Sequence, residues 1–282
     1  MLDSKKIEKI AFSFLFLAIL LVVVPVGMII VIIIQKGLPA INWQFLLDIP
    51  RHGMRSGGIF PAIIGTVYLV LGAISFALPI GLLAAIYLSE YSRDNFLNRL
   101  IKLAIVNLAG VPSVVYGLFG LALFVVFLKF GASILAGSLT LGIMILPVII
   151  TASREALESL PYAFREVSLS LGASKWQTIR HIVLPNAISG ILTGAILGLG
   201  RAAGETAPIL FTVAAFYLPR LPRSIFDQVM ALPYHLYVIS TQVPNVEEKI
   251  RYGTALVLLL LVLFMNLVTI IIRYQFRKKK KW

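Results

Sequence analysis

The stretch REALESLPYAFREVSLSLGASKWQTIRHIVLP, residues 154–185, is a polar segment that separates two long apolar runs of the chain. Pro161 suits the first turn of a helix, and Gly172 suits the left-handed residue that ends one. Ser174 can cap a second helix, because Gln177 three residues later completes a capping box. The segment is therefore predicted to form a helix, a glycine bend and a second helix, which enters the next apolar run.

Apolar runs occupy most of the chain on both sides of this segment. Hydrophobic residues make up 59% of its 282 residues and charged residues 13%, whereas a soluble domain is nearer half apolar and a quarter charged. Each run reaches roughly the 20 residues with which a helix crosses about 30 Å of hydrocarbon. The runs cover residues 11–34, 60–88, 103–128, 130–153, 182–219 and 253–272. A soluble protein with six buried helices would need polar faces that these runs lack, so the sequence predicts an all-α polytopic membrane protein with six transmembrane helices.

The first run is predicted to be a retained span and not a signal peptide. Its apolar part is longer than the roughly 7–15 residues usual for such a peptide, and no small-residue cleavage site follows it. We therefore expect three parts of the chain. An N-terminal transmembrane helix with the first external segment covers 1–59, a core with five transmembrane helices and the helical hairpin at about 160–185 covers 60–276, and a basic cytoplasmic tail covers 277–282.

Lysine and arginine residues cluster at the ends of the apolar runs, and their distribution predicts the topology. With six spans and the N-terminus inside, 16 of the 25 lysines and arginines fall in inside segments and eight in outside segments, and the last is Arg201. Cytoplasmic segments carry the excess of these residues, so both termini and the hairpin are expected in the cytoplasm. The net charge of +13 then reflects topology and attraction of the tail to anionic membrane lipid, and no nucleic-acid partner is expected.

Two longer segments are expected on the outside. Residues 35–59 hold a short amphipathic piece around Trp43 and Phe45, and tryptophan favours the membrane interface. Residues 217–252 are rich in proline and are expected to include a short helix from 224 to 230.

Sequence motifs of enzymes and cofactor sites are missing from the chain. It has no cysteine, which excludes disulfides and thiolate metal sites, and no Gly is followed by Lys, which excludes a Walker A loop. The three histidines, at 52, 181 and 235, are scattered over different loops. Residues 198–203 satisfy G-x-G-x-x-A, but inside an apolar run small residues favour tight helix packing over dinucleotide binding. We therefore expect no catalytic residue, no metal site and no cofactor bound by this chain.

Arg201 and Glu205 are the only charged residues between Ile182 and Pro219. Four residues apart on a helix, they would lie on one face. A lone arginine at mid-bilayer costs roughly 2.5–3.5 kcal/mol, so such a residue faces protein or water. Two readings stay open. The residues form either a neutralising pair that pins this helix to its neighbour, or an anion site in which the guanidinium presents paired donors to an oxyanion.

Polar residues near two prolines are further candidates for contact with a transported anion. Ser113 and Tyr116 follow Pro112, which removes a helical hydrogen bond and can free carbonyl groups toward a cavity. Thr206 lies directly after Glu205. For each of these residues, packing at a helix kink is the structural alternative.

The polar segment also carries a family motif. Glu166, Gly172, Ile182, Leu184 and Pro185 have the spacing E-A-A-x3-G-x9-I-x-L-P, with Val and Ser in place of the two alanines. The segment resembles the EAA motif of type I ABC importer permeases, which have the MetI-like fold. In that family it is the coupling helix, which docks into a groove on a separate ATPase subunit. The resemblance implies that the ATPase is contacted by Glu166, Ser170, Leu171, Gly172, Ala173 and Ser174.

Four further stretches resemble one branch of that family, the PstA-type permease subunits of phosphate-specific ABC importers. They are GGIFPAIIGT (57–66), NLAGVPSVVYGLFGL (107–121), GRAAGETAPILFT (200–212) and ALPYHLY (231–237). The resemblance implies import of inorganic phosphate through the prokaryotic cell (inner) membrane, with a substrate pathway that includes Arg201, Glu205, Thr206, Ser113 and Tyr116. It also implies a PstC-like second permease, a PstB-like ATPase dimer that binds ATP and Mg, and a PstS-like extracytoplasmic phosphate-binding protein.

Other functions are weighed against this one. A permease for another oxyanion, such as molybdate, sulfate or phosphonate, would share the hairpin and the membrane arginine. An ion-coupled secondary transporter would need no ATPase and usually shows paired broken helices in its two halves, which the sequence does not indicate. A membrane enzyme lacks any catalytic constellation.

Overall fold

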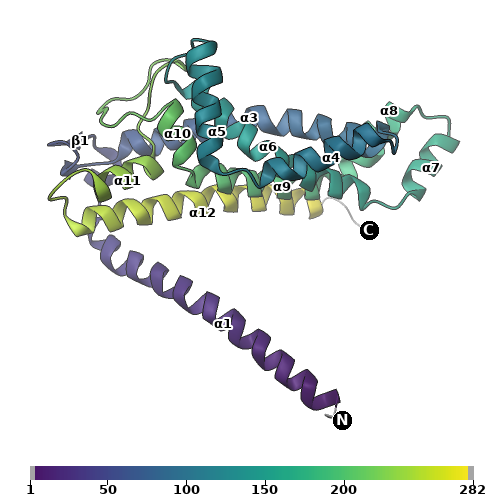
Figure 1. The fold of residues 1–282 in the computed structure, drawn as a ribbon, viewed down its shortest axis with the longest axis horizontal. Helices are drawn as coiled ribbons and strands as arrows, with labels where there is room; N and C mark the ends of the chain where they lie inside the picture. The colour runs from purple at the N-terminus through teal and green to yellow at the C-terminus, as the bar shows by residue number, and fades with distance from the viewer. Residues whose placement is uncertain (1–3, 279–282) are drawn as a thin grey trace.

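The structure is a computed structural model that describes residues 4–278. Most helices lie side by side along one long axis, and α1 projects away from them (Figure 1). Within the described residues, five helices are long and apolar enough to cross a membrane, and a bent pair brings the number to six if it counts as one span. The five are α1 (Ser4–Gly37), α3 (Phe60–Ile86), α6 (Ile134–Glu158), α9 (Leu184–Gly204) and α12 (Glu248–Lys278). The expected all-α polytopic architecture is confirmed.

The third span, expected over 103–128 with Pro112 inside it, consists of two helices at a large angle. Helices α4 (Phe96–Ala109) and α5 (Ser113–Gly120) meet at an angle of 102°, and π-helical turns (η3, Leu121–Phe127) extend α5. The bend falls at residues 110–112, where Pro112 cannot donate a backbone hydrogen bond and Gly110 is a poor helix former. The apolar run concealed the bend, because hydrophobicity does not record the direction of the backbone.

Contacts at glycines give the relative directions of the neighbouring helices. A Cβ on Gly72 would meet Ser138, and a Cβ on Gly81 would meet Ile149, so α3 and α6 run parallel. Two parallel spans need a return crossing between them, so the bent pair must carry the chain back across the membrane. Six crossings bring both ends of the chain to one side, and the cytoplasmic location of that side stays a prediction.

Helix α9 packs closely against both of its neighbours through small residues. Gly190 and Gly194 lie against Ala156 and Ala152 of α6, in antiparallel register. Gly198 also faces α6, whereas α12 lies beside the next glycine of the G-x-G-x-x-A pattern. Small residues allow this close approach of backbones, which supports the packing interpretation of that pattern.

The outer segments form a cap at the end of the bundle opposite to α7 and α8 (Figure 1). The cap includes α2 (Trp43–Leu47), the two-stranded hairpin β1 (Pro50–Arg51) and β2 (Ser56–Gly57), and α11 (Leu232–Thr241). Trp43 is exposed and Phe45 is buried, as expected for an amphipathic piece. The helix predicted over 224–230 is wrong, because this stretch consists of turns and bends.

The described part of the N-terminal helix stands apart from the bundle. Its apolar side chains from Phe12 onward are exposed, and it contacts α12 near its C-terminal end. There Lys36 Nζ lies 2.7 Å from Glu248 Oε1, and Gly37 abuts the backbone of Tyr252. The division of the chain at 59 and 276 stays a prediction, and residues 279–282 of the predicted basic tail lie outside the described residues.

Gly65→Ala is expected to lower the thermal stability of the protein. A Cβ at Gly65 would overlap the backbone oxygen of Met230 in the outer cap, which cannot move aside as a flexible side chain can. Overpacking of this kind costs about 1–3 kcal/mol or more. The matched control is Gly27→Ala, because a Cβ at Gly27 meets no atom within 4 Å. Unfolding of both variants in detergent, followed by intrinsic fluorescence, measures the difference, and equal midpoints would show that the cap does not rest on α3 as described.

Candidate functional site

Arg201 and Glu205 form an ion pair where the fifth span breaks. Helix α9 ends at Gly204, and Glu205 has extended backbone angles (φ −78°, ψ 137°) before the short helix α10 (Ala207–Thr212). Arg201 Nε lies 3.5 Å from Glu205 Oε1, and the side chains are 31% and 20% exposed. The predicted pairing is therefore present, but the prediction of one continuous helix through both residues is wrong. Pro208, in the first turn of α10, and Gly204 account for the break.

The ion pair lies within the apolar thickness of the bundle. Gly200 faces Asn266 of α12, and Thr193, two helical turns away, accepts a hydrogen bond from Arg273 at 3.1 Å. Arg201, the residue after Gly200, therefore lies at about the depth of Asn266 in the bundle. At a rise of 1.5 Å per residue, this depth is roughly 9 Å from residue 272, the nearer end of the apolar run 253–272. At this depth a partly exposed arginine needs a water-filled path or a partner chain.

The second helix break lies beside the first. Helix α5 packs on α10, and a Cβ on Gly117 would meet the backbone of Ala207 and Pro208. Buried Tyr116 donates a hydrogen bond from Oη to the carbonyl oxygen of Leu108 at 2.8 Å, which ties α5 to the end of α4. Tyr116 therefore lies on the helix that packs on α10, beside the break that follows Arg201.

The other two predicted pathway residues are also at the breaks. Thr206 is the residue before α10 and Ser113 is the first residue of α5, and both side chains are half-buried. The structure does not join Ser113 to the Arg201–Glu205 pair by any contact. Its place in the pathway stays a prediction.

One polar residue of this region was missed by the sequence analysis. The Oδ1 atom of Asn266 is buried and has no hydrogen-bond partner among residues 4–278. It faces Gly200, the residue next to Arg201. Its position in the sequence could have indicated its importance, because Asn266 is the one amide side chain in the apolar run 253–272.

The polar segment has the predicted helix–bend–helix form. Helix α7 (Ala163–Ser170) ends at a bend where Gly172 has φ +83°, and α8 (Lys175–Thr178) follows. Ser174 and Gln177 form the predicted capping box, with hydrogen bonds of 2.7 and 3.3 Å. We call residues 163–178 the hairpin. Pro161 precedes α7 instead of lying in its first turn.

The second arm of the hairpin is not a separate helix. A π-helical turn (η4, Ile179–Val183) joins α8 to α9, so that one helical segment runs from Lys175 to Gly204. The second arm and Arg201 therefore belong to the same helical segment.

The tip of the hairpin presents apolar and polar groups to its surroundings. Leu171 is 83% exposed and Val167 61% exposed, so the tip presents neighbouring apolar side chains that a partner could cover. Of the six residues expected to contact an ATPase, Ala173 is half-buried and the others are exposed. This tip is the free end of the molecule opposite to the outer cap (Figure 1).

The histidines do not form a shared site. His52 bonds to Ser56 at 2.8 Å, and His181 lies 3.1 Å from the carbonyl oxygen of Gln177. His235 is 3% exposed inside α11, and burial lowers its pKa to about 4. The prediction that all three lie in loops is wrong for His181 and His235, which are helical. No group of three or more His, Cys, Asp or Glu residues in the described part of the chain could hold a metal ion.

The broken spans, the intramembrane ion pair and the exposed hairpin define a membrane-spanning subunit of a transport system. Residues 77–282 match the family described as "Binding-protein-dependent transport system inner membrane component". The chain belongs to this family.

Individual relatives narrow the comparison. The chain is 32% identical over 279 residues to "Phosphate transport system permease protein PstA 1" of Mycobacterium tuberculosis (strain ATCC 25618 / H37Rv), covering 97% of this chain and 90% of that protein. It is 34% identical over 246 residues to "Probable phosphate transport system permease protein PstA" of Methanocaldococcus jannaschii, covering 86% and 85%. It is 33% identical over 249 residues to "Probable ABC transporter permease protein YqgI" of Bacillus subtilis (strain 168), covering 83% and 84%.

Solved structures agree on the fold. A chain of a bacterial alginate ABC transporter, in complex with an alginate-bound periplasmic protein, has a TM-score of 0.65 at 15% identity, covering 92% of this chain and 93% of that chain. A chain of the inward-facing MetNI methionine ABC transporter has a TM-score of 0.61 at 16% identity, covering 76% and 94%. The expected type I ABC importer permease fold is confirmed.

Proposed function

We propose that this chain is the permease subunit of an ATP-binding-cassette importer that moves inorganic phosphate into the cytoplasm. The observation that carries the proposal is Arg201, a partly exposed arginine at a helix break inside the membrane. A guanidinium presents planar paired donors that match phosphate oxygens. The relatives named PstA support phosphate as the particular anion.

Glu205 is proposed to hold Arg201 when no substrate is bound. The contact runs through Nε at 3.5 Å, longer than the roughly 2.7–2.9 Å of a tight charge-assisted hydrogen bond. A loose partner leaves the terminal N–H groups of the guanidinium able to turn toward an anion. The carboxylate then repels the bound phosphate and prevents the site from holding it too tightly.

The energy for transport is proposed to come from partner subunits. The exposed apolar tip of the hairpin, around Leu171, suits a groove on an ATPase dimer of the PstB type, which would bind ATP and Mg. A PstC-like permease would complete the path, and a PstS-like binding protein would deliver phosphate to the outer cap. This chain itself would carry no ATPase site and no cofactor.

Membership of a binding-protein-dependent family argues against a secondary transporter. Paired broken helices were not expected from the sequence, but two spans are broken, at 110–112 and 205–206. The family to which the chain belongs is nevertheless one of binding-protein-dependent transport, and a partner subunit is proposed to supply the energy. Other oxyanions remain as outcomes of the test.

Purification in a gentle detergent, followed by mass spectrometry of the bound proteins, tests this function. We expect a second permease, an ATPase and a phosphate-binding protein to co-purify. If the binding protein is specific for sulfate or molybdate, the substrate of this chain would be that oxyanion and not phosphate. A chain that purifies without any ATPase would contradict the proposed function.

The topology gives a separate prediction. The chain has no cysteine, so single cysteines can be placed at the exposed positions Ser174 and Ser240. In intact cells, a membrane-impermeant maleimide is expected to label Ser240→Cys but not Ser174→Cys, because the lysine and arginine bias places the hairpin inside. Permeabilised cells are the control, and both positions should then react. Labelling of both positions from outside would contradict the six-span topology.

A further inference from the structure

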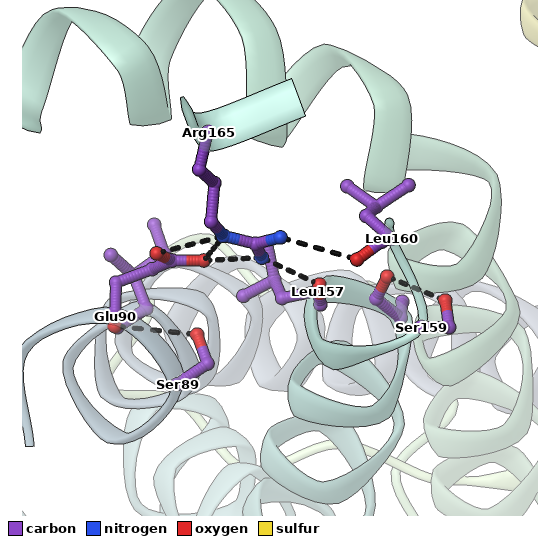
Figure 2. A network of polar contacts seen from close by, with 8 residues as sticks. Ser89, Glu90, Leu157, Ser159, Leu160 and Arg165 are labelled. Carbon is purple, nitrogen blue, oxygen red and sulfur yellow. Dashed lines mark hydrogen bonds and ion pairs between the residues drawn. The ribbon is translucent and has the colours of Figure 1, made fainter. Parts of the chain in front are cut away.

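Arg165 of the hairpin and Glu90 at the end of the second span form a partly buried, two-pronged ion pair (Figure 2). The distance from Arg165 Nη2 to Glu90 Oε1 is 2.7 Å, and Nε lies 3.1 and 3.2 Å from the two carboxylate oxygens. Their side chains are 12% and 7% exposed. A fork of this kind fixes orientation as well as distance.

The same guanidinium also binds the end of α6. Its Nη2 donates to the carbonyl oxygen of Leu157 at 2.9 Å, and its Nη1 donates to that of Leu160 at 3.2 Å (Figure 2). These carbonyls lie in and just after the last turn of α6, the end of a helix that attracts cations. One side chain therefore connects α7 to the ends of two spans, α3 and α6.

Glu90 lies on a π-helical turn (η2, Tyr87–Tyr91) that extends α3. The second arm of the hairpin contacts the same turn, because Lys175 Nζ stands 4.8 Å from the centre of the Tyr91 ring. Each arm of the hairpin thus places one cation on this turn. π-helical turns are rare and occur frequently at functional sites.

A separate hydrophobic cluster lies at this end of the bundle. It consists of buried residues from α3, α6, η4 and α9: Ala85, Ile86, Leu157, Ile179, Val183, Ala187 and Ile191. The cluster packs the ends of three spans into one unit. A displacement of α3 at η2 is therefore transmitted to α6 and α9.

The hairpin is closed by contacts of its own. The Ser168 and Thr178 hydroxyl oxygens lie 2.9 Å apart across the two arms, and Ser174 caps the second arm. Gly172 supplies the left-handed bend. The internal fold of the hairpin accordingly does not require the Arg165–Glu90 pair, which instead fixes the hairpin to the spans.

We propose that Arg165 and Glu90 are positioning residues that transmit movement of the ATPase-bound hairpin to the second span, and through its packing on α6 and α9 to the Arg201 site. This inference rests on the proposed function, because it assumes that the hairpin binds an ATPase. The pair is internal to this chain, so its loss should leave the ATPase bound while transport is no longer driven.

Arg165→Lys and Glu90→Gln test the inference in the complete importer, reconstituted in liposomes with its second permease, ATPase and binding protein. We expect the amount of bound ATPase to be unchanged and the ATP hydrolysed per phosphate imported to rise about tenfold or more, because each change removes the partly buried fork. Asp94→Asn is the matched control. It removes an exposed ion pair of the same 2.7 Å length between Asp94, which lies between η2 and α4, and Arg99 of α4, and the ratio should stay within about twofold of wild type.

A cross-linked variant provides a second readout. With Glu90→Cys and Arg165→Cys in this cysteine-free chain, a bifunctional thiol reagent replaces the ion pair by a covalent link. We expect the ratio of ATP to phosphate to be raised before cross-linking and to return to within about threefold of wild type afterwards.

Three results would overturn the inference and leave the proposed function standing. In the first, the ratio of ATP hydrolysed to phosphate imported stays at the wild-type value while hydrolysis and import fall together. In the second, the Arg165→Lys complex loses its bound ATPase. In the third, the ratio of the cross-linked variant does not recover. Failure of the wild-type chain to bind any ATPase would instead contradict the proposed function itself.

Discussion

Replacing Arg201 by glutamine is expected to reduce phosphate uptake by about 100-fold or more while the complex still assembles. Hydrogen bonds to charged groups contribute about 1.5–3 kcal/mol each, so loss of two of them accounts for an effect of this size. Arg201→Lys keeps the charge but loses the fork, and it should also be impaired. Uptake of radioactive phosphate by cells, normalised to the complex in the membrane, measures both effects.

A double change separates the two readings of this ion pair. If Arg201 and Glu205 only neutralised one another, Arg201→Gln with Glu205→Gln would avoid an unpaired charge in the membrane and restore transport. We expect that it does not, because the anion would still lack its donors. Near-normal uptake by the double variant would make the pair structural, and the phosphate path would have to be sought elsewhere.

Replacing Gly172 by valine is expected to weaken docking of the ATPase strongly. Gly172 has φ +83°, a conformation that a β-branched residue resists at a cost of roughly 1–2 kcal/mol or more. A Cβ at this position meets no atom within 4 Å, so any effect comes from the backbone and not from a clash. The tip, with exposed Leu171 beside it, would then lose the shape that fits the partner.

Co-purification of the ATPase with the Gly172→Val chain measures this loss, which we expect to be about tenfold or more in bound ATPase. Gly172→Asn is the matched control, because asparagine tolerates the left-handed conformation, and it should retain most of the binding. A valine variant that binds and stimulates the ATPase as the wild type does would remove the hairpin from the coupling mechanism.

The hairpin could be predicted in detail because its shape is set by neighbouring residues. Gly172 requires a bend, and Ser174 with Gln177 requires a helix start, whatever surrounds them. The apolar runs likewise required spans, since their length matches the membrane. Local chemistry and hydrophobicity were sufficient for these elements.

The helix breaks and the long-range contacts could not be predicted in the same way. Apolar residues continue on both sides of residues 110–112, so the apolar run does not record a turn of 102°. The Arg165–Glu90 pair joins residues 75 positions apart and depends on a π-helical turn at the end of α3. Asn266 was overlooked because its significance comes from its contact with Gly200, which lies on the adjacent helix α9 and is distant in the sequence.

Transport by the purified complex tests the central claim most directly. Liposomes would hold this chain with its co-purified permease and ATPase, with ATP and Mg on the ATPase side and the binding protein and radioactive phosphate on the other. We predict phosphate accumulation that requires both ATP and the binding protein, and that excess sulfate or molybdate does not suppress. Uptake that proceeds without ATP, or that carries sulfate or molybdate in preference to phosphate, would contradict the account.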